Sequence, residues 1–338
     1  MKLDALVFTG DLKQFPQTAR FLEDLGYDAL WTLETQHNPF FPLLLSAEHT
    51  QKIKVGTSIA VAFPRSPMVL AHIAWDLQEF CNGRLILGLG TQVRGHIERR
   101  FSVPWNSPGP RLREMILALR AIWDCWQNGT PLKFQGKFYS FTLMTPFFNP
   151  GPIRHPKIPI YVGGLNPYMC RLVGELCDGM HIHPLHTVKF IREAIVPKIR
   201  EEASKAGRDS RQISLSTAAF VATGKDRAAV EKAKEKIRSQ IAFYSSTKNY
   251  HPVLELHGWG ETARALQKKS IAGDWDGMPR EISDEMLEEF ALIGSYAEIA
   301  DKIHNKYDGV IDRLSFYDCL PMPGEEKEWK PIIKAING

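Results

Sequence analysis

The stretch GTSIAVAFPRSP, residues 56–67, has no charged side chain before Arg65 and consists of small or apolar residues up to Phe63. Such a run is typical of a strand in a parallel sheet, which is buried on both faces. It ends in two prolines and an arginine, and an apolar segment of helical character follows from Pro67. Proline suits the first position of a helix, and Ser66 suits its N-cap. The stretch therefore predicts a buried strand that leads directly into a helix.

The same alternation of short apolar strands and amphipathic helices extends along the whole chain. The eight predicted strands cover residues 3–8, 28–34, 53–63, 84–90, 157–164, 178–184, 212–223 and 310–318. The helices expected between them cover residues 15–27, 41–50, 67–81, 166–177, 187–207 with an interruption at Pro197, 225–243 and 295–307. Eight such units predict the α/β class and a (β/α)8 TIM barrel. We expect a single domain, 1–338, with inserts near 103–156 and 245–292.

A doubly wound sheet is the alternative fold for this pattern. Its usual G-x-G-x-x-G fingerprint is missing after the first strand, where the sequence FTGDLKQF holds one glycine.

The composition excludes several classes of function. Of the 338 residues, 44% are hydrophobic and 24% are charged, and the formal net charge is +4, which is too small and too scattered to favour nucleic acid as a partner. No stretch approaches 18 apolar residues, and the first residues do not resemble a signal peptide, so we expect no membrane partner. The odd number of cysteines, five, indicates free thiols and a cytoplasmic location.

Barrel enzymes place their active sites at the carboxyl ends of the strands, which selects residues 8–9, 34–38, 58–64, 90–96, 163–166, 181–186 and 316–318. Glu34 and His37 follow the second strand and form a carboxylate–imidazole pair that could move a proton; alternatively, Glu34 forms hydrogen bonds inside the barrel and His37 only packs. His96 follows the fourth strand. The sequence VGGLNPYM places Asn166 as the cap of a helix that starts at Pro167, which suits a phosphate, although an ordinary strand-to-helix turn has the same pattern.

The sequence resembles the bacterial luciferase-like superfamily of flavin- and deazaflavin-dependent oxidoreductases over nearly its whole length. The motifs that carry the resemblance are LGYDALWTLETQHNPF, VGTSIAVAFPRSPMVLAHIAWDL, NGRLILGLGTQV and IPIYVGGLNPYMCRLVGELCDG. They are most similar to the branch that uses the deazaflavin coenzyme F420. The resemblance implies an oxidoreductase that transfers hydride between the deazaflavin C5 and a small organic substrate. The alternatives are an FMN-dependent luciferase-like monooxygenase and a non-catalytic flavin-binding barrel; a hydrolase barrel lacks an evident nucleophile or metal set.

The resemblance also implies where the cofactor binds. In related enzymes the third strand ends in a bulge with a cis peptide bond between two non-proline residues, and the flat ring rests against it; here this bond is Ser58–Ile59. The residues expected to contact the cofactor are therefore Ser58, Ile59, Ala60, Gly90, Thr91, Gln92, Gly163, Gly164 and Asn166. Relatives commonly form dimers, so we expect a homodimer.

The resemblance leaves the acid–base residue open. Many deazaflavin relatives have adjacent Asp and His after the second strand, where this chain has Thr35 and Gln36. Glu34 or His37 is the expected substitute, and His96 is a further catalytic candidate that could reach the substrate or the ring, unless its segment is a solvated face.

The histidines of residues 181–186 and the aromatic residues of the second insert each allow a functional and a purely structural interpretation. The sequence HIHPLH, residues 181–186, could ligate a metal ion, but carboxylates on other strands would be needed and the superfamily uses no metal, so we predict none. The aromatic residues of the 245–292 insert either cover an apolar or ring-shaped substrate or form a small satellite core.

Overall fold

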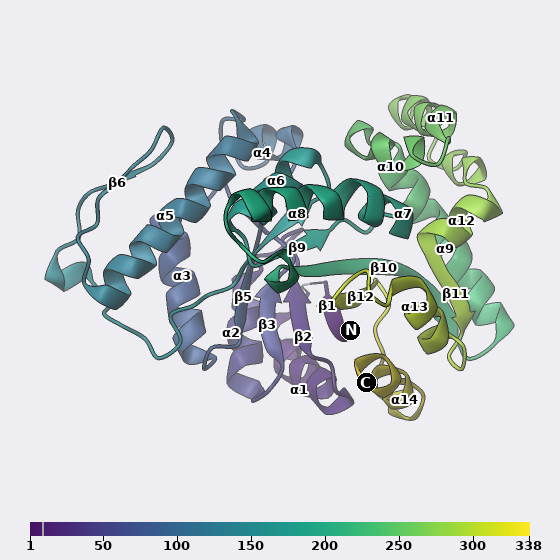
Figure 1. The fold of residues 1–338 in the computed structure, drawn as a ribbon. Helices are drawn as coiled ribbons and strands as arrows, with labels where there is room; N and C mark the ends of the chain where they lie inside the picture. Colours follow the sequence, from purple (N-terminus) through teal and green to yellow (C-terminus); the bar gives the residue numbers. More distant parts are fainter. Residues whose placement is uncertain (9) are drawn as a thin grey trace.

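The computed structural model describes residues 1–8 and 10–338. A closed barrel of eight parallel strands forms its centre (Figure 1), as the sequence predicts. In spatial order the strands are β1 (Lys2–Val7), β2 (Ala29–Thr32), β3 (Lys54–Thr57), β5 (Leu85–Gly90), β8 (Ile160–Gly164), β9 (Gly179–Ile182), β10 (Ser214–Gly224) and β12 (Arg313–Tyr317). Pairing of β12 with β1 and of β9 with β10 completes the ring. The barrel interior follows the period-two alternation of strands, with side chains of Leu6, Trp31, Ile86 and Tyr161 in one inner cluster.

Helices surround the barrel and close its outer hydrophobic layer (Figure 1). The main ones are α1 (Phe15–Leu25), α2 (Phe40–His49), α3 (Pro67–Phe80), α5 (Pro108–Asn128), α6 (Pro167–Leu176), α8 (Val196–Lys205), α9 (Arg227–Ser245), α13 (Ile299–Tyr307) and α14 (Glu326–Asn337). The predicted caps are present, since Ser66 accepts a hydrogen bond from Val69 N and Asn166 accepts one from Met169 N. The predicted interruption at Pro197 takes the form of a π-helical segment, η3 (Ile191–Ile195), directly before α8.

The two long connections have different structures. Residues 129–157 follow α5 as an extended arm that carries a small hairpin of β6 (Phe134–Gln135) and β7 (Ser140–Phe141), at the left of Figure 1. Residues after α9 form α10 (His251–Glu255), α11 (Gly260–Ala272) and α12 (Asp284–Phe290), gathered at the right of Figure 1. The remaining short elements are η1 (Leu12–Gln14), α4 (Arg94–Arg99), η2 (Pro146–Phe148), α7 (Val188–Phe190), η4 (Ser210–Gln212), η5 (Lys248–Tyr250) and η6 (Met278–Glu281).

Two strands differ from the predicted set of eight. The predicted strand 53–63 is broken after Thr57, and its continuation, β4 (Ala60–Val61), pairs with β5. An additional strand, β11 (Ala291–Ser295), pairs with residues 220–224 of β10. β10 has 11 residues and extends past its barrel neighbours, so its end offers free backbone groups to a ninth strand. The first two residues of β11 lie in the insert predicted at 245–292, and its last residue lies in the predicted helix 295–307, which begins only at Ile299.

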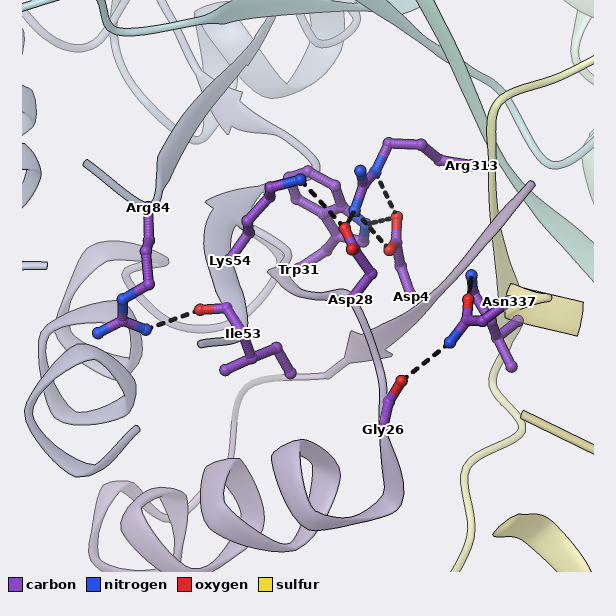
Figure 2. A network of polar contacts seen from close by, with 10 residues as sticks. Asp4, Gly26, Asp28, Trp31, Ile53, Lys54, Arg84, Arg313 and Asn337 are labelled. Atoms are coloured by element: carbon purple, nitrogen blue, oxygen red, sulfur yellow. Dashed lines mark hydrogen bonds and ion pairs between the residues drawn. The ribbon is translucent and has the colours of Figure 1, made fainter. Parts of the chain in front are cut away.

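A buried polar network holds the amino ends of the strands together (Figure 2). Arg313 donates to both oxygens of Asp4 at 2.8 and 2.7 Å, and Trp31 Nε1 donates to the same carboxylate at 2.9 Å. Arg313 also contacts Asp28, which accepts a hydrogen bond from Lys54 Nζ at 3.2 Å. Burial raises the pKa of Asp4 to about 6, although Arg313 acts in the opposite direction. These residues fix one end of the barrel and leave the other end for the site.

Candidate active site

A cavity of about 780 Å3 opens at the carboxyl ends of the barrel strands. Each of the eight strands contributes to its lining, from its own residues or from residues just after it. Eight of the nine residues predicted to contact a cofactor lie around it: Ser58, Ile59, Gly90, Thr91, Gln92, Gly163, Gly164 and Asn166. The ninth, Ala60, is fully buried and can only support the wall from behind.

One wall of the cavity is formed by the break between β3 and β4. The bond Ser58–Ile59 is cis, as the sequence analysis expects. A Cβ atom on Gly90 would lie 2.7 Å from Ile59 Cδ1, and a Cβ atom on Gly163 would lie 2.9 Å from Ile59 Cγ2. Both distances are shorter than carbon–carbon contact allows, so a side chain at either position would push the isoleucine side chain out of its place. The result is a smooth apolar wall suited to a flat ring.

The amino end of α6 lies at the edge of the same cavity. Gly163, Gly164 and Asn166 all line it, and Asn166 Oδ1 accepts from Met169 N at 3.0 Å. Pro167 has no N–H group and Met169 N is already bonded to Asn166, so the first turn of this ten-residue helix offers Tyr168 N and the positive end of the helix dipole. Nearby, the side-chain oxygen of Gln92 accepts from Val93 N, which leaves its amide N–H groups for a ligand. This edge can therefore hold an anionic group such as a phosphate.

Glu34 forms a buried ion pair beside the wall. Its carboxylate accepts hydrogen bonds from Arg65 Nη1 and Nη2, at 2.7 and 2.9 Å, and from Val61 N at 2.7 Å. The side chains of Glu34 and Arg65 are only 7% and 12% exposed. Glu34 N also donates to Ile59 O at 3.4 Å. Glu34 thus clamps the segment that follows the cis bond, and the arginine in the Pro-Arg-Ser-Pro turn is its partner.

The three predicted acid–base residues all lie outside the cavity lining in the described part of the chain. His37 and His96 are both exposed, and neither lines the cavity in the described part of the chain. Each lies close in sequence to a lining residue, His37 to Thr35 and His96 to Arg94. Glu34 is not a lining residue either among those described. The predicted acid–base residues therefore do not gather at one point.

The opposite part of the cavity contains aromatic residues, of which Tyr244 alone lies outside the strand ends and the insert that the sequence indicates. His183 stacks on Tyr250 with ring centres 4.1 Å apart, and it meets the edge of Tyr244 at 4.7 Å. Tyr317 packs edge-on against Tyr244 and against Phe8. His183 and Tyr317 lie in strand-end segments that barrel topology indicates from the sequence. No local pattern marks Tyr244, near the end of α9, or Tyr250, in η5.

His181 forms part of the floor of the cavity. It packs edge-on against Trp31 with ring centres 4.9 Å apart, and only 6% of the residue is exposed. Its Nε2 atom is buried and has no hydrogen-bond partner among the described residues. Burial lowers the pKa of His181 to about 3, so the ring is neutral at pH 7. A neutral imidazole with an unused nitrogen can accept or donate one hydrogen bond to a bound molecule.

The three histidines of residues 181–186 do not converge. His186 is fully buried and bonds to the hydroxyl of Tyr307 at 3.0 Å, outside the cavity lining. His183 instead lies in the aromatic group. Within residues 1–8 and 10–338, no three His, Cys, Asp or Glu side chains are placed to hold a metal ion.

The insert aromatics named in the sequence analysis have mixed positions. His257 stacks on Trp259 with ring centres 4.6 Å apart, and Trp259 packs on Phe290, which fits a satellite core. Trp275 is 54% exposed. In the same described residues, no helix has the length and apolar character to span a membrane.

Comparison with known sequences gives a consistent family match. The profile described as "Luciferase-like monooxygenase" matches residues 4–313. An uncharacterised protein of Mycobacterium tuberculosis is 45% identical over 314 residues, 93% of this chain and 92% of that protein. A 5,10-methylenetetrahydromethanopterin reductase of Archaeoglobus fulgidus is 28% identical over 306 residues, which cover 88% of this chain and 87% of the reductase.

Solved structures share the fold over the full length. The coenzyme F420-dependent tetrahydromethanopterin reductase of Methanopyrus kandleri has a TM-score of 0.80 at 22% identity, covering 99% of this chain and 98% of that one. The oxygenating constituent of 3,6-diketocamphane monooxygenase from Pseudomonas putida, in complex with FMN, has a TM-score of 0.68 at 16% identity, covering 100% and 97%.

Proposed function

The chain belongs to the luciferase-like monooxygenase family, and from this premise we propose that it is an F420-dependent oxidoreductase. In this proposal it exchanges hydride between the deazaflavin C5 and a small organic substrate in the cavity at the carboxyl face of the barrel. The observation that carries the proposal is the smooth wall of Ile59 over Gly90 and Gly163. A reductase among the sequence relatives and an F420-dependent enzyme among the structural neighbours favour the deazaflavin over FMN.

The described residues fit such a cofactor. Ser58 and Ile59 would support the face of the ring, because any side chain on Gly90 or Gly163 would displace Ile59 from the wall. Thr91 and the free amide of Gln92 would bind polar ring or linker atoms. Gly164, Asn166 and the first turn of α6 would hold the phosphate-bearing tail.

When bound, the deazaflavin supplies a two-electron hydride carrier, and the residues of the chain position the reactants and handle the proton. Glu34 keeps the wall in place through Arg65 and Val61. We propose that His37 and His96 exchange the accompanying proton with water at the rim, since both are exposed beside lining residues. The apolar wall would exclude water from the face of the ring that it contacts.

The second candidate is an FMN-dependent monooxygenase. Its support is the FMN-bound monooxygenase of the same fold, which aligns over the full chain. A non-catalytic flavin-binding barrel is the third, because the predicted acid–base residues lie outside the cavity lining.

An assay under nitrogen and in air separates the three candidates. The purified chain is mixed with reduced F420 and a panel of aldehydes, ketones and enones under nitrogen, and oxidation of F420 is followed by its absorbance. The proposal predicts substrate-dependent oxidation that oxygen does not accelerate. Oxygen uptake with reduced FMN but not with reduced F420 would indicate that the chain is an FMN-dependent monooxygenase. Cofactor binding without turnover of any panel member would favour the binding barrel.

We also propose a cytoplasmic homodimer. All five cysteines are free and four are buried, which suits a reducing compartment. Phe41 and Leu44 on α2 are 60% and 44% exposed, which suits a helix that a second subunit covers. Analytical ultracentrifugation tests the subunit count, and a monomer at micromolar concentration would contradict it.

A further inference from the structure

The cavity has two unlike sides, and the strand order places them opposite each other. In the ring of eight strands, β10 lies four positions from β3 in either direction. The β3 side is the smooth wall around Ile59. The side centred on β10 is formed by aromatic residues of α9, η5 and β12 and by those directly after β1 and β9; they are Phe8, His183, Tyr244, Tyr250 and Tyr317, and we call them the aromatic wall.

The rings of the aromatic wall hold one another in fixed orientations. His183 and Tyr250 stack with an interplanar angle of 22°, whereas Tyr244 meets His183 at 87°. The ring of Tyr317 packs edge-on against that of Phe8, with ring centres 5.8 Å apart and an interplanar angle of 89°. Rings fixed in this way lose little conformational entropy when a ligand binds. They also offer both ring faces and ring edges, which favour a flat, conjugated ligand over a saturated one.

The aromatic wall carries one polar feature, a pair of phenols. The hydroxyl oxygens of Tyr244 and Tyr317 lie 2.7 Å apart, so one hydroxyl hydrogen joins them and the other is available to a ligand. Burial raises the pKa of both phenols, which therefore stay protonated and able to donate at neutral pH. A ligand oxygen that reaches this pair would accept a hydrogen bond on the side of the cavity away from the smooth wall.

We propose that the aromatic wall is the substrate subsite and that it selects planar conjugated carbonyl compounds, with the carbonyl oxygen bound by the Tyr244–Tyr317 pair. This inference rests on the proposed function, because it assigns the smooth wall to the cofactor and the facing wall to its substrate. The carbonyl carbon then lies between the two walls, where hydride reaches it. In the reduction, the reduced deazaflavin would supply the hydride from its C5–H bond and be oxidised, the new carbon–hydrogen bond would form as the carbon–oxygen π bond breaks, and the oxygen would take its proton from the tyrosine pair, which a proton from water then restores.

Binding measurements test the proposal without turnover. Three probes of similar size are titrated against the chain by ligand-observed NMR: acetophenone, ethylbenzene, which lacks the oxygen, and methyl cyclohexyl ketone, which lacks the aromatic ring. We expect acetophenone to bind about threefold to tenfold more tightly than the saturated ketone. The variant Tyr317→Phe keeps the ring and removes the hydroxyl, so it should weaken acetophenone about threefold to tenfold and leave ethylbenzene unchanged.

Matched variants separate the contribution of the aromatic wall from unspecific effects of replacing an aromatic residue. Tyr296→Phe removes a phenol that packs on Trp329 and should change no probe affinity. Tyr250→Leu should weaken both aromatic probes and spare the saturated ketone; if that variant does not fold, Phe8→Leu, at a residue 40% exposed, replaces it. Equal affinity for acetophenone and the saturated ketone would overturn the proposal, as would an equal effect of Tyr317→Phe on both aromatic probes.

The probe titrations and a separate F420 titration can fail independently, so they test the aromatic wall and the proposed cofactor separately. F420 binding with no discrimination among the probes overturns the aromatic wall alone. Discrimination among the probes without F420 binding leaves the aromatic wall as a ligand site and overturns the proposed function on which its substrate role rests.

Discussion

Replacing Glu34 by glutamine tests whether this residue clamps the wall or transfers a proton. The Glu34→Gln variant leaves Arg65 buried without its anionic partner, and glutamine cannot accept all three hydrogen bonds that the carboxylate accepts. Breaking a buried ion pair by removing one partner costs about 3–5 kcal/mol. For 338 residues, an unfolding entropy of about 2.1 cal/mol/K per residue amounts to about 0.7 kcal/mol/K, so we expect Tm to fall by about 4–7 °C.

Thermal unfolding and F420 titration of the same samples decide between the two roles. A clamp predicts that Tm and F420 affinity both fall, because Glu34 contacts Val61 and Ile59 next to the wall. Adding Arg65→Met to Glu34→Gln should restore part of the lost Tm, since no unpaired charge then stays buried. Glu201→Gln, which removes an exposed carboxylate paired with Lys205, is the control and should leave Tm unchanged. An unchanged Tm with lost turnover in Glu34→Gln would refute the clamp and restore Glu34 as an acid or base.

Three further outcomes follow from the structure. In Gly163→Ala the new Cβ would lie 2.9 Å from Ile59 Cγ2, so F420 affinity measured by calorimetry should fall about tenfold or more; an unchanged affinity would contradict the smooth wall. The histidines of residues 181–186 have pKa values of about 3 to 4 when folded, against 6.5 when unfolded. The unfolded chain therefore binds more protons below pH 6.5, and the unfolding free energy in urea should fall by up to about 4 kcal/mol per pH unit from pH 6 to 4; a flat profile would be inconsistent with their burial. In Asp4→Asn the buried Arg313 loses its main partner, so the free energy of unfolding should fall by about 3–5 kcal/mol while F420 binding by the folded protein stays the same. A reduced F420 affinity would contradict the view that this network acts only at the amino ends of the strands.

The fold was predictable because its determinants are local. Apolar runs buried on both faces marked all eight barrel strands, and the N-caps at Ser66 and Asn166 were correctly identified. β11 was missed because its pairing depends on how far β10 extends, and that length is a property of the assembled barrel.

The site was only partly predictable. Glycines and small residues at strand ends pointed to the cavity because barrel topology brings all carboxyl ends together. The environment of Glu34 was not foreseen, since its partner Arg65 lies 31 residues away and nothing local pairs them. The aromatic wall was only partly foreseen, because Tyr244 reaches the cavity from a helix, and the path of that helix and of the insert that carries Tyr250 depends on the tertiary structure.

The most direct test of the account is a pair of calorimetric titrations of the purified apo-protein, one with coenzyme F420 and one with FMN. The account predicts an F420 dissociation constant of about 1 μM or below and an FMN affinity at least about tenfold weaker. Tighter binding of FMN, or binding of neither, would contradict the assignment of the Ser58–Ile59 wall and the α6 amino end to a deazaflavin.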